Sequence, residues 1–369
     1  MTYLSVAREP IGRFVDAGGD ALIAAKCWGL LTGYDARWSG VPFTVQAVET
    51  VVSSDLWNPA TQAKSRSFRL MGKLDVRGIA PDGRRCIIDH KTCSEDIADP
   101  NAPYWRQLIV ENQPRHYELL EWLNGRRADY ALWDVMRKPA ISPKKLTIAD
   151  AKSAMHTRRY FDYRMTDDDV VSLGSDGRET LRMYSARLAH DCTIERPDHY
   201  FQRRPIALLE ADLLEHAEEV WSHGQDILIA RRANRWLKNP GACMMYGSPC
   251  KFLGICSGYD TPESDNWKRR PWMHPELPQN GSDGRDVLTN TRIKSFLTCR
   301  KKHYFEYELG IERVDAEDRE ALVFGVLWHE CLEAWWRAQI TEEGATDGDT
   351  ASSPVSAVGT TADTESFAF

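Results

Sequence analysis

The chain has 369 residues, a formal net charge of −7 at neutral pH and a hydrophobic content of 42%. This composition is typical of a soluble globular protein with a core large enough for one or two domains. No apolar run approaches the roughly 18 residues of a membrane span, and no basic head precedes an apolar block. The sequence therefore predicts neither a membrane partner nor a secretory signal, and we expect a cytoplasmic protein.

Alternating and helical patterns predict a mixed α/β chain. Apolar residues recur at threes and fours over 14–38, which predicts a helix. Three strand-like stretches follow at 43–52, 67–80 and 84–92. A Pro-Asp-Gly turn joins the last two, so we expect a β-meander.

Residues 102–123 also have helical spacing, but Pro114 in the middle should kink or break that helix. The patterns beyond it predict a further series of elements: strand 129–137, helix 148–155, strand 199–204, helix 207–236 and a helical block at 290–338. The range 261–289 contains a stretch rich in Pro, Gly and Asp, which predicts a linker. The tail at 339–369 is rich in small and polar residues and should be disordered.

The net charge is distributed unevenly. Residues 341–369 hold six acidic residues and no lysine or arginine, so this tail accounts for nearly all of the negative charge. Four basic clusters also contain aromatic residues, as contact with phosphates and stacking on bases require: 200–205, 231–238, 267–272 and 299–304. Each cluster could equally be a solvated face.

An acid and a base interrupt the strand at 84–92. Asp89 and Lys91 are two residues apart, so they point to the same face, and Asp75 on the preceding strand falls roughly opposite them. Two carboxylates suit a hard divalent cation, and a lysine beside them can orient or deprotonate a water for attack on phosphorus. An isolated Asp-x-Lys could instead be a strand-edge salt bridge, worth about 0–1 kcal/mol when exposed.

This pattern, Gly72-x-x-Asp75 followed by Ile-Ile-Asp-x-Lys-Thr, resembles the PD-(D/E)xK nuclease superfamily, in particular its RecB, AddB and CRISPR-associated exonuclease branch with the phage relatives. Gln113 and Tyr117 form the Q-x-x-x-Y motif of that branch, and their spacing places both on one face of a helix. The resemblance implies an α/β, restriction-endonuclease-like core, in which a central mixed β-sheet, the β-meander, is flanked by helices.

The resemblance also implies a helical histidine in the pattern F-G-x-x-x-H-x-x-L-E ahead of the carboxylates. Residues 1–74 contain no histidine, yet Gly325, His329 and Glu333 match this pattern near the other end of the chain. The alternative for His329 is a polar tip on an apolar helix.

We interpret the order of the segments as a circular permutation. In it, 290–338 completes a nuclease core formed by 1–260, and 261–289 connects them. The alternative is a reading frame taken across the ends of a circular or terminally redundant genome, with Met273 near the natural start. Such a chimera could fail to fold.

The nine cysteines are odd in number and unevenly spaced, which suits a reducing compartment better than a disulfide framework. The resemblance implies a four-iron four-sulfur cluster on four of them: Cys243, Cys250, Cys256 and Cys299. The spacing C-x6-C-x5-C is wider than in the bacterial exonucleases. Zinc on four thiolates and unligated thiols remain the alternatives. The other five are expected to be packing residues: Cys27, Cys86, Cys93, Cys192 and Cys331.

The resemblance implies a metal-dependent DNA nuclease, an exonuclease of phage or bacterial recombination and repair that hydrolyses phosphodiester bonds in single-stranded or end-containing DNA. Its Mg²⁺ or Mn²⁺ ligands would be four groups: Asp75, Asp89, the backbone carbonyl of His90 and the imidazole of His329. Lys91 would position the attacking water, and Gln113 and Tyr117 would orient Lys91 and the phosphate. Glu49 could support the metal ligands from behind, but a surface strand acid is the favoured interpretation.

The alternative function is a nuclease-like DNA-binding or docking module without catalysis, in which the cysteine loop docks to a helicase or recombinase. The sequence contains no G-x-x-x-x-G-K-[ST] loop, so separation of DNA strands would need a helicase partner.

Overall fold

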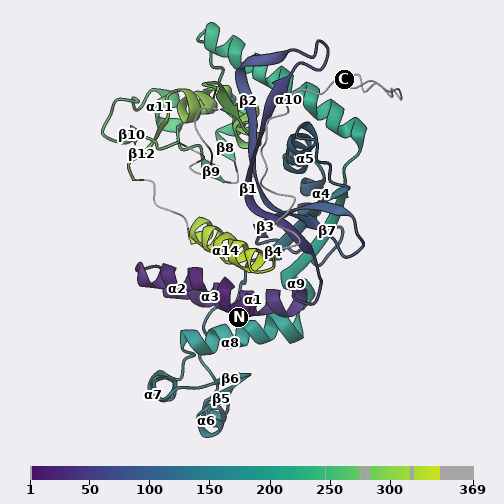
Figure 1. Ribbon diagram of the computed structural model, residues 1–369. Helices are drawn as coiled ribbons and strands as arrows, with labels where there is room; N and C mark the ends of the chain where they lie inside the picture. Colours follow the sequence, from purple (N-terminus) through teal and green to yellow (C-terminus); the bar gives the residue numbers. More distant parts are fainter. Residues whose placement is uncertain are drawn as a thin grey trace.

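The computed structural model describes residues 2–245, 247–272, 274, 277, 283–315 and 320–340. At its centre lies a six-stranded mixed sheet in the order β1-β2-β3-β4-β7, with β11 paired to β2 (Figure 1). Its strands are β1 (Thr44–Trp57), β2 (Lys64–Ile79), β3 (Arg85–Cys93), β4 (Tyr130–Arg137), β7 (Phe201–Ala207) and β11 (Asp286–Leu288). Helices flank this sheet, so the predicted α/β, restriction-endonuclease-like fold is confirmed.

The strand pairing follows from the hydrophobic patterns. β1, β2 and β3 pair antiparallel in sequence order, which is the predicted meander, whereas β4 runs parallel to β3. The first seven residues of β4 are buried, as expected for a strand covered on both faces. A parallel connection needs a crossover on one face of the sheet, and α4 (Pro103–Ile109) and α5 (Gln113–Leu123) supply it.

Pro114 breaks the predicted helix 102–123 into α4 and α5. The proline lies in the first turn of α5, where its missing N–H costs no hydrogen bond. The predicted helix 14–38 is also divided, into α2 (Glu9–Asp16) and α3 (Ala21–Trp38). Gly18 adopts a left-handed φ of 84° between them, and the Asp20 carboxylate caps α3 by accepting two backbone N–H groups at 2.8 and 2.9 Å.

The C-terminal part of the chain packs into the same core. α14 (Glu320–Arg337) lies between the sheet and the N-terminal helices α1 (Tyr3–Ala7), α2 and α3 (Figure 1). Three of its tryptophans are at most 1% exposed: Trp328, Trp335 and Trp336. The predicted helical block 290–338 therefore exists, with α12 (Asn290–Thr298), α13 (Arg300–His303), a π-helical turn (Tyr304–Glu308) and β12 (Ile311–Arg313) ahead of α14.

Two short strands lie inside 261–289, where the sequence predicts a linker. β10 (Trp267–Arg269) pairs with β12, and β11 adds to β2 of the main sheet. Strands of three residues are too short to give a period-two signal, which explains why the pattern predicts a linker alone. Of the predicted disordered tail, residues 341–369 lie outside the described residues.

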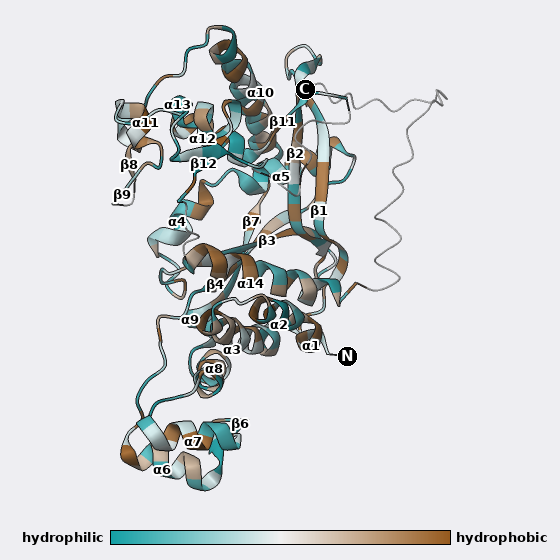
Figure 2. Ribbon diagram, turned by 90° about the vertical axis from the view of Figure 1, so that its left-hand side faces the viewer, coloured by the Kyte–Doolittle hydropathy of each residue, from teal (hydrophilic) through white to brown (hydrophobic). Residues whose placement is uncertain are grey.

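A small lobe extends from the core between β4 and α8 (Leu181–His190). It consists of α6 (Ile148–Thr157), a hairpin of β5 (Arg159–Tyr160) and β6 (Tyr163–Arg164), and α7 (Asp167–Asp176). It has its own core of six residues: Leu146, Ala151, Ala154, Met165, Leu173 and Met183. Figure 2 shows the lobe standing apart from the sheet at the end of extended connections. The sequence predicts α6 but not the hairpin, α7 or α8.

After the lobe the chain returns through α9 (Pro197–Tyr200) to β7 and then forms α10 (Glu210–Arg232), close to the predicted strand 199–204 and helix 207–236. None of the helices in the described ranges is long and apolar enough to cross a membrane.

Candidate metal centre

The β2–β3 hairpin brings the two predicted aspartates together. Val76 pairs with Ile88 in the antiparallel ladder, so the residues that follow in register, Asp75 and Asp89, are opposite each other. The Asp75 Oδ2 atom accepts the backbone N–H of His90 at 2.7 Å, which fixes this carboxylate across the hairpin. Asp89 is 2% exposed and forms an ion pair with Lys91. The arrangement is therefore a buried and a partly buried aspartate with one lysine, and it is not the exposed strand-edge salt bridge of the alternative interpretation.

A hydrogen-bonded chain extends from Lys91 to α5. The Lys91 Nζ atom donates to Gln113 Oε1 at 2.9 Å, and Gln113 Nε2 donates to the Tyr117 hydroxyl at 2.8 Å. Gly72 makes this approach of α5 to β2 possible, because a Cβ at that position would lie 3.0 Å from the Tyr117 ring and from Leu120. The glycine of the G-x-x-D motif thus lets the helix deliver Gln113 to the lysine.

α14 adds a histidine from the other end of the sequence. The possible ligand atoms of Glu49, Asp75 and His329 all lie within 4.8 Å of one another. Atoms that bind one Mg²⁺ or Mn²⁺ at about 2.1 Å can be at most about 4.2 Å apart, so three atoms this close together are compatible with one bound cation. The set of two carboxylates and one imidazole therefore fits a divalent cation, and the Asp89 carboxylate lies next to it.

Glu49 differs from the prediction of a surface strand acid, which is wrong. Its side chain is 11% exposed and pairs with Lys73. Its φ of 52° is in the left-handed region, a strained conformation for a residue with a side chain. It lies between Val48, which pairs with Val76, and Thr50, so it is level with Asp75 across the β1–β2 ladder. Only this cross-strand register identifies Glu49.

Burial controls the charges of the site. Burial raises the pKa of Asp89 to about 6, with Lys91 opposing and the neighbouring Asp75 adding to the effect. Burial also raises the pKa of Glu49, against its pairing with Lys73. It lowers the pKa of His329 to about 4, so this imidazole is neutral at neutral pH and its lone pair can bind a metal. A divalent cation would relieve the repulsion among the three clustered carboxylates.

A buried polar network supports the site from behind. The Nδ1 atom of His90 lies 3.1 Å from Asp134 on β4, and Asp134 accepts hydrogen bonds from Tyr34 and from Arg203 Nε. Burial opposes ionisation of Asp134, but Arg203 and His90 hold the pKa of Asp134 well below its usual value. His90 thus donates its backbone N–H to Asp75 and places its ring against Asp134, with the rings of His329 and Trp336 at centroid distances of 6.2 and 6.1 Å. Its predicted role as a carbonyl ligand stays a prediction.

The four cysteines predicted to bind a cluster lie in neighbouring segments. A short hairpin joins Cys243 to Cys250, whose N–H donates to the Cys243 carbonyl at 2.8 Å. Burial, together with the nearby thiols of Cys299 and Cys243, raises the pKa of Cys256. All four thiols are free and partly exposed, whereas the five predicted packing cysteines are buried, as expected: Cys27, Cys86, Cys93, Cys192 and Cys331.

Each of the four basic clusters of the sequence contributes at least one cation to an ion pair with another part of the molecule. Arg203 is buried against Asp134. The other clusters form ion pairs between distant segments: Arg231 with Glu308 and Asp286, Lys268 and Arg270 with Glu312, and Arg300 with Asp226. The pairs of Arg231 and Arg300 join the C-terminal segment to α10, those of Lys268 and Arg270 join β10 and the residue after it to β12, and the interpretation of the clusters as contacts to nucleic acid gains no support.

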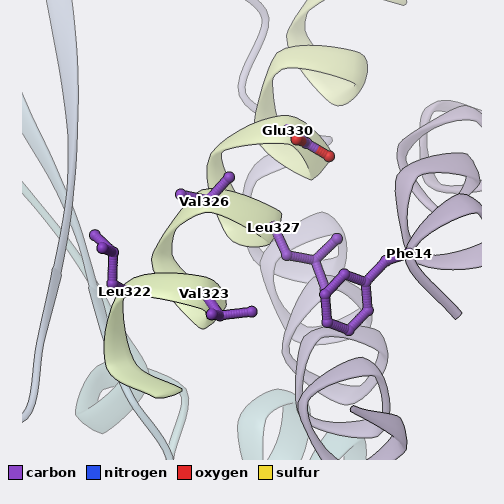
Figure 3. A pocket seen from close by; sticks show the side chains of 6 residues that line it. All are labelled: Phe14, Leu322, Val323, Val326, Leu327 and Glu330. Atoms are coloured by element: carbon purple, nitrogen blue, oxygen red, sulfur yellow. The ribbon is translucent and has the colours of Figure 1, made fainter. Parts of the chain in front are cut away.

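α14 and α2 also form a separate apolar pocket. Phe14 from α2 and five residues of α14 line it (Figure 3): Leu322, Val323, Val326, Leu327 and Glu330. Glu330 is its only acidic lining residue, so among the described residues this pocket has no cluster of metal-binding groups. α14 therefore contributes His329 to the metal centre and also packs against α2.

The C-terminal part of the sequence matches a known family. A family model described as the PD-(D/E)XK nuclease superfamily matches residues 287–362. No curated protein matches the sequence significantly. The matched range includes His329 and its helix, while Asp75, Asp89 and Lys91 reach the same site from the first part of the chain. The match supports the PD-(D/E)XK nuclease superfamily as the family of this chain.

Proposed function

We propose that the protein is a metal-dependent deoxyribonuclease, an exonuclease that acts on DNA ends in phage or bacterial recombination and repair, in the cytoplasm. The family match supports a nuclease in general, with DNA as its substrate and phosphodiester hydrolysis as its reaction. The observation that carries the proposal is the meeting of Glu49, Asp75 and His329 beside the Asp89–Lys91 pair. Three segments distant in sequence build this one site.

The residues divide the chemistry between them. Asp75, Asp89 and His329 would hold the cation, with Glu49 as a further carboxylate that the sequence does not predict. When bound, Mg²⁺ or Mn²⁺ supplies Lewis acidity toward the phosphate and lowers the pKa of a bound water. Lys91, held by Gln113 at 2.9 Å, can orient that water and stabilise negative charge that develops on the phosphate oxygens. A neutral imidazole among the ligands favours Mn²⁺.

The packing supports the proposed circular permutation. The rings of Tyr3 and Trp335 lie 6.0 Å apart, so the start of α1 is beside the C-terminal end of α14. In the unpermuted order of segments, the helix that carries the histidine comes first and the chain continues from its end into the helices that correspond to α1–α3. The end of α14 and the start of α1 must therefore lie close together in a permuted chain. The contacts of α14 with α1, α2, α3 and β1 make it an integral part of the core. They speak against a chimera that cannot fold.

We also propose a four-iron four-sulfur cluster on Cys243, Cys250, Cys256 and Cys299. A tetrahedral zinc site with Zn–S bonds of about 2.3 Å would place its sulfur atoms about 3.8 Å apart. Among the described residues, no three of these sulfur atoms lie within 4.8 Å of one another, so a zinc site would need the thiolates to move closer together. Anaerobically purified protein should contain about four iron atoms and matching sulfide. Stoichiometric zinc with no sulfide would contradict the proposal.

Removal of metal tests the nuclease itself. End-labelled linear DNA should be degraded in the presence of Mn²⁺, untouched in EDTA and degraded again once excess Mn²⁺ is restored, because the carboxylates and His329 cannot activate water without the cation. A folded protein that binds Mn²⁺ and DNA but cleaves neither single-stranded nor duplex ends would refute the nuclease. It would favour the docking module, with a helicase or recombinase as its partner.

A further inference from the structure

The hairpin of the small lobe places two arginines directly opposite each other. Arg159 of β5 pairs with Arg164 of β6, and the Met165 N–H donates to the Arg158 carbonyl at 3.0 Å in the next pair. This hydrogen bond makes 159–164 a non-hydrogen-bonded pair, the type in which side chains on one face are closest. Two like charges at such positions destabilise a hairpin.

Both arginines point away from the lobe. The tyrosines that follow and precede them point inward, since the Tyr160 hydroxyl donates to Glu179 at 2.6 Å and the Tyr163 hydroxyl donates to Asp169 at 2.7 Å. Side chains alternate along a strand, so Arg159 and Arg164 occupy the outer face, where both are exposed. Within the described ranges, neither guanidinium has an ion pair or hydrogen bond with the protein.

The lobe repeats this arrangement a second time. Lys145 and Arg178 form an antiparallel bridge, between the hydrogen bonds of Leu146 N–H to the Gly177 carbonyl (2.8 Å) and Glu179 N–H to the Lys144 carbonyl (3.0 Å). Lys145 and Arg178 are again exposed, and in the described part of the chain their side chains have no acidic partner.

Two buried acids of the lobe are engaged in its own structure. Asp169 closes the capping box of α7 with Thr166, and Glu179 is buried in a bidentate ion pair with Arg187. Neither carboxylate can neutralise the two like-charged pairs. In the described part of the chain neither pair has an acidic side-chain partner, and a bridging phosphate has oxygens enough to accept hydrogen bonds from both cationic groups of a pair.

We propose that this lobe binds the phosphodiester backbone of the DNA substrate through the pairs Arg159/Arg164 and Lys145/Arg178. The inference rests on the proposed nuclease function and adds a contact away from the metal centre, on a lobe that stands apart from the sheet (Figure 2). Two cation pairs on one lobe suit a chain of phosphates better than a single small anion. Backbone contacts of this kind hold DNA in place without reading its sequence.

The test is DNA binding under conditions that prevent cleavage. Fluorescence anisotropy with a labelled duplex of about 30 base pairs, in EDTA and between about 50 and 200 mM salt, compares the full chain with R159Q/R164Q, with K145Q/R178Q and with the fourfold variant. Removing one cation that neutralises a phosphate lowers the slope of log K against log salt by about 0.9 on duplex DNA. Each double variant should therefore lose up to about 1.8 units of slope, which corresponds to up to about 60-fold weaker binding at about 100 mM salt.

Matched controls separate this effect from a general reduction of charge. R66Q/K152Q removes two exposed cations, of which one lies on β2 and one on α6, and it should bind like the parent. The R159Q/R164Q variant should melt at or above the parent temperature, because it removes a repulsion, so weaker binding would not reflect unfolding. Unchanged affinity and slope in the fourfold variant would overturn the proposal.

The nuclease activity and the binding role of the lobe can be refuted separately. If the parent binds DNA through these residues but does not cleave it with Mn²⁺, the nuclease proposal fails and the binding lobe stands. If the parent cleaves DNA and the variants bind it as tightly as the R66Q/K152Q control, the lobe proposal fails and the nuclease stands.

Discussion

Replacing Asp89 with asparagine should abolish both Mn²⁺ binding and DNA cleavage, whereas replacing Lys91 with methionine should abolish cleavage alone. Asp89 is 2% exposed, and among the described residues its carboxylate has Lys91 as its only ion-pair partner, so its remaining lone pairs are available to a cation. Asparagine keeps the shape of this side chain and removes the negative charge that a divalent cation needs. The loss in cleavage rate should reach about 10³-fold or more.

Lys91 acts on the reacting groups and is not a metal ligand. Its ammonium group is fixed by Asp89 and Gln113, and removing one preorganised group of this kind typically costs about 10²–10³ in rate. Methionine preserves the apolar stem of the side chain. Without the lysine, the pKa of Asp89 should rise further above its present value of about 6, so Mn²⁺ affinity must be compared near pH 8, where this carboxylate is ionised in both proteins.

Calorimetric titration with Mn²⁺ and initial rates on end-labelled DNA give the two readouts. Lys64 offers a matched control, because it pairs with Asp55 at the far end of β2, and its change to methionine should leave both readouts unchanged. If the Asp89→Asn variant cleaves DNA at the rate of the parent, the metal centre is not the site of hydrolysis. If the Lys91→Met variant loses Mn²⁺ as well, the lysine has a structural role only.

The parts of the site that the sequence predicts correctly depend on short-range patterns. A hairpin with a Pro-Asp-Gly turn has a nearly fixed register, so the position of Asp75 opposite Asp89 follows from counting residues. Likewise, a spacing of four on a helix places Gln113 and Tyr117 on one face. The structure brings both pairs together as the patterns indicate. Their chemical roles remain predictions until the variants are measured.

Glu49 lies beyond what short-range patterns can predict. Its place beside Asp75 depends on the register of β1 against β2, and the loop between these strands, at 58–63, gives no clear turn signal to set it. The left-handed conformation of Glu49 could not be expected for a residue with a long side chain in a strand. An acid that is strained, nearly buried and close to two other ligands is visible only in the folded chain.

The sequence is also a poor guide to which basic residues are available to bind a partner. Local clusters such as 267–272 look available for nucleic acid, yet Lys268 and Arg270 pair with Glu312, which is more than 40 residues away. Arg159 and Arg164 attract no notice in the sequence, but the hairpin places them opposite each other. Which cations remain available is therefore decided by tertiary pairing, and composition does not reveal it.

The buried network behind the site should respond strongly to the loss of Asp134. Its side chain and that of Arg203 are 2% and 7% exposed, and their shortest contact is 3.1 Å. Asp134→Ala leaves the guanidinium buried without a counter-charge and removes the acceptor of the Tyr34 hydroxyl. Breaking a buried ion pair in this way costs about 3–5 kcal/mol of unfolding free energy. Asp198→Ala, which breaks an exposed pair with Arg37, should cost at most about 1 kcal/mol.

Urea unfolding of a double variant shows whether the unpaired charge or the lost hydrogen bonds destabilise Asp134→Ala. If the unpaired charge is what destabilises Asp134→Ala, then the combination of Arg203→Met with Asp134→Leu should be more stable than Asp134→Ala alone, because it leaves no buried charge behind. A double variant less stable than Asp134→Ala would instead mean that the network contributes through its hydrogen bonds. In either case Mn²⁺ affinity should fall, since His90 is held by Asp134 on one side and donates its backbone N–H to Asp75 on the other. The network would then set the position of a metal ligand as well as the stability of the sheet.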